Sequence, residues 1–220
     1  AGPDLLELAR RSRAWWVWVS TAKLIARKGD TRAVPGLAAG LAVDEPSVRW
    51  AAMEVLLRMS PGAVREVWLA ALALPYPEVR SNAAQALGAG GSGGAGELLK
   101  ALARATHASR AGLVQALGMT GSREAVPAIV AVLEDRANLQ EARVAAAEAL
   151  GRLRDRAGVE PLISVLGEPD VAPIACAALG ELGDARAVTP LVQRLAGPDG
   201  ITSRAALAAL VKLGPASAPD

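Results

Sequence analysis

The chain has 220 residues, of which 52% are hydrophobic but only 3% are aromatic, and it contains no Phe. Ala and Leu are strong helix formers whereas sheets prefer β-branched and aromatic residues, so a composition dominated by Ala, Leu and Val favours an all-helical protein. The net charge of +2 and the pI near 9.0 are too mild for the basic stripe expected of a nucleic-acid-binding protein, although the first 32 residues are clearly basic.

The chain has one cysteine, Cys176, so no disulfide can form within it and no redox compartment is indicated. The apolar run at residues 14–19 is far shorter than the roughly 20 residues that a membrane span requires. We therefore expect a soluble chain and favour a cytoplasmic location. The first residue is Ala1 rather than Met, which fits both a processed protein and a piece of a longer one.

A short motif recurs along the chain at a spacing of about thirty residues, which is typical of a solenoid of stacked repeats. Its copies are Ala-Gly-Pro-Asp-Leu at 1–5, Ala-Val-Pro-Gly-Leu at 33–37, Ala-Val-Pro-Ala-Ile at 125–129, Gly-Val-Glu-Pro-Leu at 158–162 and Ala-Val-Thr-Pro-Leu at 187–191. A second motif, an apolar residue and Arg followed by an Ala-rich stretch and Leu-Gly, lies between these copies. Together they predict a single domain over residues 1–220 with repeats starting near 1, 33, 64, 95, 125, 158 and 187.

Each repeat is predicted to form two short helices. Prolines 3, 35, 127, 161 and 190 fit the first turn of the first helix, where the missing N–H costs nothing. Apolar residues three and four apart, such as Leu37 with Leu41 and Leu191 with Leu195, are expected to be buried. Turns follow at 44–47, 75–77, 167–170 and 197–200. The second helix is predicted to end at the glycine of Leu-Gly, in a left-handed conformation.

This pattern closely resembles HEAT repeats, in particular the short type found in phycobilisome-lyase-like proteins. The resemblance implies an all-α, right-handed α-solenoid (an α-α superhelix) of about seven HEAT-like hairpins, related to armadillo-like helical folds. It also implies that the second helices line a concave side and that arginines form a ladder along the turns. The ladder positions are Arg49, Arg80, Arg110 and Arg143, and the pattern is broken at Ala172-Pro173 and at Ser203-Arg204.

A partner surface is expected one, four, five and eight residues after the ladder arginine, because these positions share a helix face. In the first two repeats they include Trp18, Ile25, Trp50, Met53, Glu54 and Leu57, which we predict to be partner-binding. Exposed Trp and other apolar residues mark interaction sites. The alternative is an atypical capping face of a terminal repeat. Trp15 and Trp16 are expected to pack against such a cap or the second repeat, and Trp68 to be first-helix core equivalent to Leu37.

Farther along the chain the same positions are mostly small. They include Ser81, Ala84, Ala111, Ala147, Pro173 and Cys176. Small residues allow close approach of a partner backbone, and they are equally typical of tight helix packing.

Motifs for catalysis and cofactor binding are weak. The glycines at 88–93 match a dinucleotide-binding pattern, but they follow a predicted helix instead of a strand, so an inter-repeat turn or a hinge is the better interpretation. His107 is the only histidine and is expected to be a solvated loop residue, and Cys176 a small packed residue. No cofactor, metal site or catalytic residue is predicted.

The function expected is that of a non-enzymatic protein–protein interaction scaffold, which binds another protein or a peptide on its concave face. Two alternatives stay open. One is a tetrapyrrole-handling, lyase-like or chaperone protein, in which Trp18 and Trp50 would stack on a flat ring. The other is a nucleic-acid-binding HEAT-like protein, with a membrane-surface contact of the basic first repeat as a minor variant.

Overall fold

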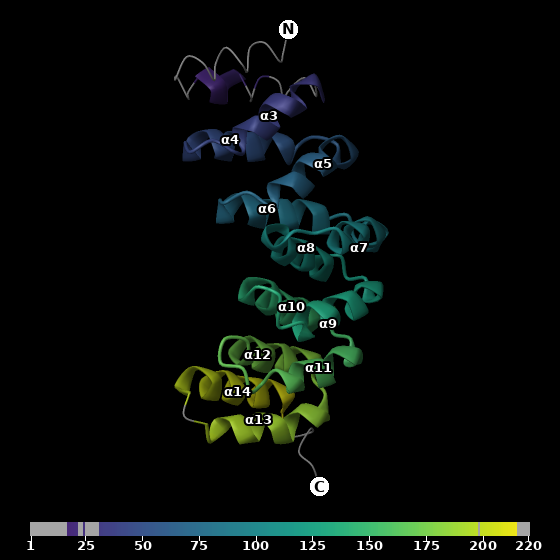
Figure 1. Ribbon diagram of the computed structural model, residues 1–220, viewed down its shortest axis with the longest axis vertical. Helices are drawn as coiled ribbons and strands as arrows, with labels where there is room; N and C mark the ends of the chain where they lie inside the picture. The colour runs from purple at the N-terminus through teal and green to yellow at the C-terminus, as the bar shows by residue number, and fades with distance from the viewer. Residues whose placement is uncertain (1–16, 22–23, 25–30, 198, 215–220) are drawn as a thin grey trace. The chain divides into compact units, whose positions relative to one another are not determined.

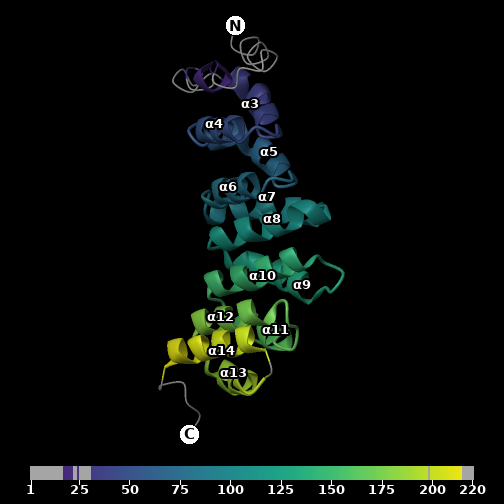
Figure 2. The same ribbon diagram turned by 90° about the vertical axis from the view of Figure 1, so that its left-hand side faces the viewer.

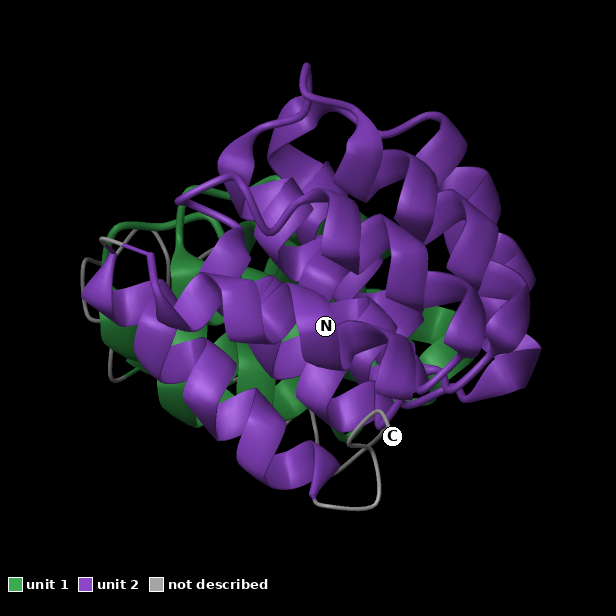
Figure 3. Ribbon diagram, turned by 90° about the horizontal axis from the view of Figure 1, so that it is seen from below, with its two compact units in different colours: residues 1–87 green, residues 88–220 purple. Residues whose placement is uncertain are grey.

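The computed structural model describes residues 17–21, 24, 31–197 and 199–214. Its helices are labelled in Figure 1. The chain divides into two compact units, residues 1–87 (unit 1) and residues 88–220 (unit 2), which Figure 3 shows in green and purple. Each unit is built from helices joined by short turns, and every regular element in the described ranges is an α-helix or a 3₁₀-helix.

Unit 1 contains two helical hairpins in its described part. Their elements are the 3₁₀-helix η1 (Thr31–Ala33), α3 (Val34–Gly40), α4 (Pro46–Leu56), α5 (Pro61–Ala71) and α6 (Pro77–Gly88), whose last residue is the first of unit 2. Proline stands in the first turn of α3, α4 and α5, where its fixed φ suits the start of a helix. The hairpin predicted for residues 1–32 lies mostly outside the described residues.

Unit 2 contains four hairpins, each preceded by a single turn of 3₁₀-helix. Their elements are η2 (Ser92–Gly94), α7 (Ala95–Ala103), α8 (His107–Met119), η3 (Arg123–Ala125), α9 (Val126–Glu134), α10 (Gln140–Leu153), η4 (Arg156–Gly158), α11 (Val159–Ser164), α12 (Ala172–Leu182), η5 (Ala185–Ala187), α13 (Val188–Leu195) and α14 (Gly200–Leu213). The second helices α8, α10, α12 and α14 pack on one another in succession. The predicted fold class, an all-α solenoid of helical hairpins, is therefore confirmed.

The first helices contribute large apolar residues to the core, as predicted. Leu37, Leu41, Ile129 and Leu191 are fully buried or nearly so, and Trp68 of α5 is 3% exposed, which confirms that it is a core residue. The prediction for Leu195 is wrong, because this residue is 37% exposed. Equivalent leucines of earlier hairpins are covered by the next hairpin, and no hairpin follows α14 within the described residues.

The glycines of the Leu-Gly motif have a different role from the one predicted. Gly118, Gly151 and Gly180 lie inside their helices, and the left-handed residues come three positions later, at Gly121, Arg154 and Gly183. The reason for glycine is the adjacent helix. A Cβ atom on Gly118 would lie 2.7 Å from the Cβ atom of Ala149, and the same contact recurs between Gly151 and Ala178 and between Gly180 and Ala209. These glycines let neighbouring second helices approach backbone to backbone.

The ladder arginines tie each second helix to the end of the preceding first helix. Arg49 donates from Nη1 to the carbonyl oxygens of Val43 (2.9 Å) and Asp44 (2.8 Å), and Arg143 donates from Nε to that of Leu133 (2.8 Å). Val43 and Asp44 lie in the turn after α3, and Leu133 lies in the last turn of α9, where carbonyl groups lack a partner within the helix. The bonds made by the arginines therefore stabilise the helix end and the turn together.

Two of these arginines also bridge to a carboxylate of the following repeat. Arg49 Nη2 lies 2.7 Å from Glu78 and Arg143 Nη1 lies 2.5 Å from Glu168. The Arg143 guanidinium is the main cause of a lowered pKa of Glu168. The pKa of Glu78 is lowered by its own backbone N–H and by Arg49.

The ladder changes at the two places where the sequence departs from it. Ala172 and Pro173 supply no guanidinium to the turn before α12, and Arg194 of α13 instead donates to the carbonyl oxygen of Leu166 at 3.3 Å. In the last hairpin Ser203 takes the ladder position and donates to the carbonyl oxygen of Arg194 at 3.2 Å. The turns are thus still bonded, by different side chains.

Candidate functional site

A groove of about 560 Å³ runs along the exposed face of α4 in unit 1. Its wall is largely apolar, and two large apolar residues of the wall are exposed, Trp50 to 58% and Leu57 to 50%. Asn82 of α6 and Val19 complete the groove from the neighbouring repeats. The lining residues are Val19, Pro46, Ser47, Trp50, Ala51, Met53, Glu54, Leu57 and Asn82.

The predicted exposure of Trp18 and Met53 is wrong. Trp18 is 2% exposed, and its ring lies so close to Gly40 that a Cβ atom there would be 2.5 Å from Cζ2 of the indole. Trp18 is therefore a core residue. Met53 is 1% exposed and lies at the floor of the groove.

The burial of Met53 matches the burial of the equivalent residues in unit 2. Four residues after each ladder arginine of unit 2 the side chain is also fully buried, as at Val114 and Ala147. This position points toward the packed neighbouring helices, whereas the positions one and five residues after the arginine stay at least partly open, as at Trp50 and Glu54.

The other predicted partner-binding residues divide into two groups. Ile25, like Trp15 and Trp16, lies outside the described residues. Glu54 is partly exposed at the groove and pairs with Arg58 at 3.0 Å, one helical turn away. Both side chains of this pair are well exposed, so its contribution to stability is small.

The groove is open because the side chain of Leu57 keeps the neighbouring second helix at a distance. Leu57 stands eight residues after the ladder arginine, at the position where unit 2 has Gly118 and Gly151. Glycine there admits the next second helix, whereas a leucine side chain cannot be accommodated at backbone contact distance. The departure is visible in the sequence as Leu56-Leu57 in place of Leu-Gly, and this signal could have predicted the open groove.

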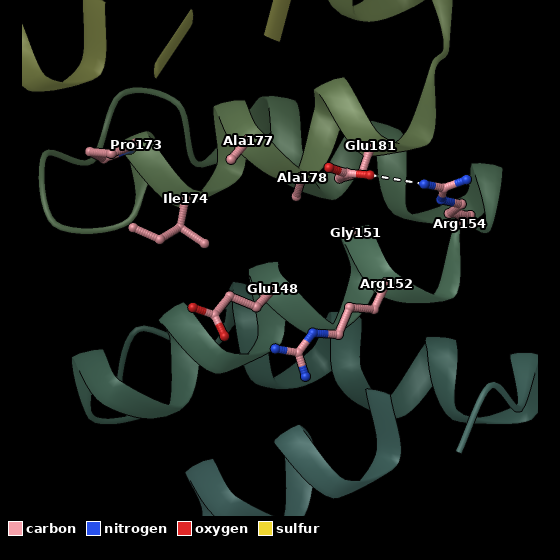
Figure 4. A pocket seen from close by; sticks show the side chains of 9 residues that line it. All are labelled: Glu148, Gly151, Arg152, Arg154, Pro173, Ile174, Ala177, Ala178 and Glu181. Atoms are coloured by element: carbon pink, nitrogen blue, oxygen red, sulfur yellow. Dashed lines mark hydrogen bonds and ion pairs between the residues drawn. The ribbon is translucent and has the colours of Figure 1, made fainter. Parts of the chain in front are cut away.

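A second groove, of about 550 Å³, lies between α10 and α12 in unit 2 and is shown in Figure 4. The side chains of Glu148 and Arg152 lie on the α10 side, and Ile174 and Ala177 lie on the α12 side. The full lining is Glu148, Gly151, Arg152, Arg154, Pro173, Ile174, Ala177, Ala178 and Glu181.

Charge distinguishes this second groove from the first. Arg154 lies 3.0 Å from Glu181, which also pairs with Lys212 at 2.5 Å. The Lys212 ammonium and the Arg154 guanidinium lower the pKa of Glu181. Of this lining, the sequence analysis named Pro173 and did not name the charged residues near the helix ends.

Among the described residues, the side chains that could support catalysis or bind a metal do not form a cluster. Within the described ranges, no three His, Cys, Asp or Glu side chains come close enough together to hold a metal ion. His107 is the exposed first residue of α8, and Cys176 is buried, which raises the pKa of its thiol to about 11. The glycines near residue 90 form a turn that joins α6 to α7, so the helix-to-helix context differs from that of a dinucleotide site.

Two further features of the described helices bear on the class of protein. None of them has both the length and the apolar character that crossing a bilayer demands. The hairpins instead present grooves on successive second helices, which is the architecture of an α-solenoid. The fold and the grooves thus define a helical-repeat protein with surfaces suited to binding.

Comparison with known proteins gives the family. A family model described as HEAT repeats matches residues 95–174 and 139–211, which together cover more than half of the chain. The chain belongs to the HEAT-repeat family, and the resemblance noted from the sequence is confirmed. A search of the curated proteins finds no match.

Two solved structures with TM-scores above 0.5 agree with this fold, and a third is similar in sequence over most of its length. Kap121p is 14% identical with a TM-score of 0.73 over 96% of this chain, which spans only 29% of the Kap121p chain. An engineered protein is 19% identical with a TM-score of 0.51, covering 96% of this chain and 68% of that one. The complex of CpcE and CpcF of phycocyanin lyase from Nostoc sp. PCC7120 is 22% identical with a TM-score of 0.47, covering 97% and 88% of the two chains.

Proposed function

We propose that this protein is a non-enzymatic scaffold that binds a protein or peptide partner in the groove along α4. The observation that carries the proposal is the exposure of both Trp50 and Leu57 in the lining of one groove. Trp is the residue most enriched at binding hot spots, and apolar surface of this kind is costly to leave in water.

The gain available from covering Trp50 can be estimated. An indole side chain buries about 150–250 Å² when fully covered. With 58% of the residue exposed, a partner that covers it would gain about 2–4 kcal/mol at 25 cal/mol per Å². This value is an upper estimate, because association and side-chain ordering offset part of it.

The tetrapyrrole alternative loses the observation on which it was based. Stacking of a flat tetrapyrrole between Trp18 and Trp50 requires both rings at the surface, and Trp18 is buried. The basic residues that favoured nucleic acid belong to the first 32 residues, most of which lie outside the described part of the chain, so that alternative stays a prediction. Protein binding depends on neither observation.

The test is quantitative affinity capture by the intact chain, with cross-linking to locate the bound partner. The double variant Trp50→Ser/Leu57→Ser should lose at least about tenfold in partner recovery, as expected when hot-spot residues are truncated. Its thermal unfolding should match that of the wild type, because both side chains are exposed.

The matched control is Leu139→Ser, which removes a leucine of similar exposure (52%) far from this groove in the sequence. It should leave capture unchanged. Equal recovery by the double variant and the wild type, with both folded, would refute the assignment of the groove as the partner site.

A further inference from the structure

The last hairpin, α13 and α14, carries an unusual share of exposed apolar side chains. Half of the large apolar residues that are exposed among the described residues lie on it: Val192, Leu195, Ile201, Leu207 and Val211. Leu207 is 55% exposed and Val211 is 73% exposed. Figures 1 and 2 both place α14 beside α12 and α13 beside α14, at the C-terminal end of unit 2.

Three of these residues occupy positions that earlier hairpins bury. Leu195 corresponds to Leu133 and Leu166 of the preceding first helices, which are 0% and 5% exposed. Leu207 corresponds to Ala147 and Cys176, both fully buried. Leu195, Leu207 and Val211 therefore form the face with which each earlier hairpin packs on the next one; we refer to it as the end face.

Val211 shows that the end face is not suited to another hairpin packed in the same way. Its equivalents, Gly151 and Gly180, approach the next helix so closely that an added Cβ atom would lie 3.0 Å from the Cα atom of Ala178 and 2.9 Å from that of Ala209. A valine cannot enter such a contact. The end face needs an occupant whose helix axis lies farther away and whose own side chains fill the gap.

The charges that flank the end face indicate the chemistry of this occupant. On α14 the sequence Arg204, Leu207, Ala208, Val211, Lys212 follows one helix stripe, with an apolar centre and a cation at each end. Lys212 pairs with Glu181 of α12, while Arg204 donates to a backbone oxygen of its own helix, that of Gly200.

Cations outnumber carboxylates on the last hairpin, which carries Arg194, Arg204 and Lys212. Asp199 is the only acidic residue between positions 188 and 213, and it accepts hydrogen bonds from the N–H groups of Ile201 and Thr202 at the start of α14. The Thr202 hydroxyl, these backbone N–H groups and the charge of Arg204 lower the pKa of Asp199. The end face thus presents an apolar strip between positive charges, to which a strip of opposite charge is complementary.

We infer that the end face of α13 and α14 binds an amphipathic helix of a partner protein, with apolar residues along one stripe and Asp or Glu on either side of them. Such helices dock into apolar surfaces through residues spaced three, four and seven apart. This surface is separate in sequence from the α4 groove and does not depend on its proposed role.

The experiment measures fluorescence polarisation of three labelled synthetic helices of about 18 residues, a length of about five turns. The first has leucines on one stripe flanked by Glu, the second has Lys in place of Glu, and the third has the composition of the first with its leucines spread around the helix. The intact chain should bind the first saturably and about tenfold more tightly than either of the others.

Variants locate the binding. Leu207→Glu and Val211→Glu should each weaken binding of the acidic helix about tenfold or more, because each places a like charge in the apolar strip. Both residues are exposed, so the fold should persist, which circular dichroism checks. Leu139→Glu and Trp50→Ser serve as controls and should bind as the wild type does.

Several outcomes would overturn the inference: no saturable binding of the acidic helix, equal affinity for the acidic and basic helices, or wild-type binding by Leu207→Glu. Analytical ultracentrifugation tests whether the free chain self-associates through the end face. Self-association of the free chain that Leu207→Glu abolishes would show that a second copy covers the end face in place of a partner helix.

Discussion

Replacing Gly118 with Ala is expected to destabilise unit 2 although Ala is the better helix former. The new Cβ atom would lie 2.7 Å from the Cβ atom and 2.9 Å from the Cα atom of Ala149. Ordinary carbon–carbon contacts are about 3.5–4.0 Å, so α8 and α10 must separate by up to about 1 Å. Overpacking of this kind costs about 1–3 kcal/mol.

The control is Gly96→Ala in α7, where nothing lies within 4 Å of the added atom. A compatible Gly→Ala change stabilises by about 0.4–1 kcal/mol through the unfolded chain. We therefore expect Gly118→Ala to lower the free energy of unfolding by about 1–2 kcal/mol and Gly96→Ala to raise it slightly.

The assay is urea denaturation followed by circular dichroism, with amide hydrogen exchange of α8 and α10 measured in parallel, because repeat arrays can unfold in steps. If Gly118→Ala proves as stable as Gly96→Ala, with unchanged exchange in both helices, the close-contact role assigned to these glycines is wrong.

Three further predictions concern single side chains. Glu168→Gln should lower the free energy of unfolding by about 1–3 kcal/mol at pH 7, as for a hydrogen bond to a charged group. Arg143 depresses the pKa of Glu168, and the carboxylate stabilises the fold only while it is ionised. The difference from wild type should therefore vanish in urea titrations at pH well below about 4.3. Cys176, whose pKa burial raises to about 11, should react with a thiol reagent at pH 8 only after urea is added, and rapid reaction of the native chain would contradict this. Trp18→Ser should lower the free energy of unfolding by about 3–5 kcal/mol in thermal or urea unfolding, and Trp50→Ser should lower it by less than about 0.5 kcal/mol. Equal losses would contradict the burial of the Trp18 indole and the exposure of Trp50.

The candidate site was only partly predictable from the sequence. The helix-face argument located Trp50, Glu54 and Leu57 in one groove, because residues three and four apart share a helix face wherever the helix lies. It failed for Trp18 and Met53, because the same spacing does not say which edge of the face is covered by a neighbouring helix. The second groove was missed in part, since Arg154 reaches Glu181 only through the packing of α10 on α12.

The sequence by itself determined the helical hairpins, their boundaries near prolines and turns, and the HEAT-repeat family, because these depend on local propensity and on a repeat that returns every thirty residues. Only the tertiary structure decided which side chains are covered. Gly118 and Leu57 occupy equivalent positions, yet one admits a neighbouring helix and the other borders an open groove. Burial is a property of what packs against a residue, so it is settled when the hairpins stack and not before.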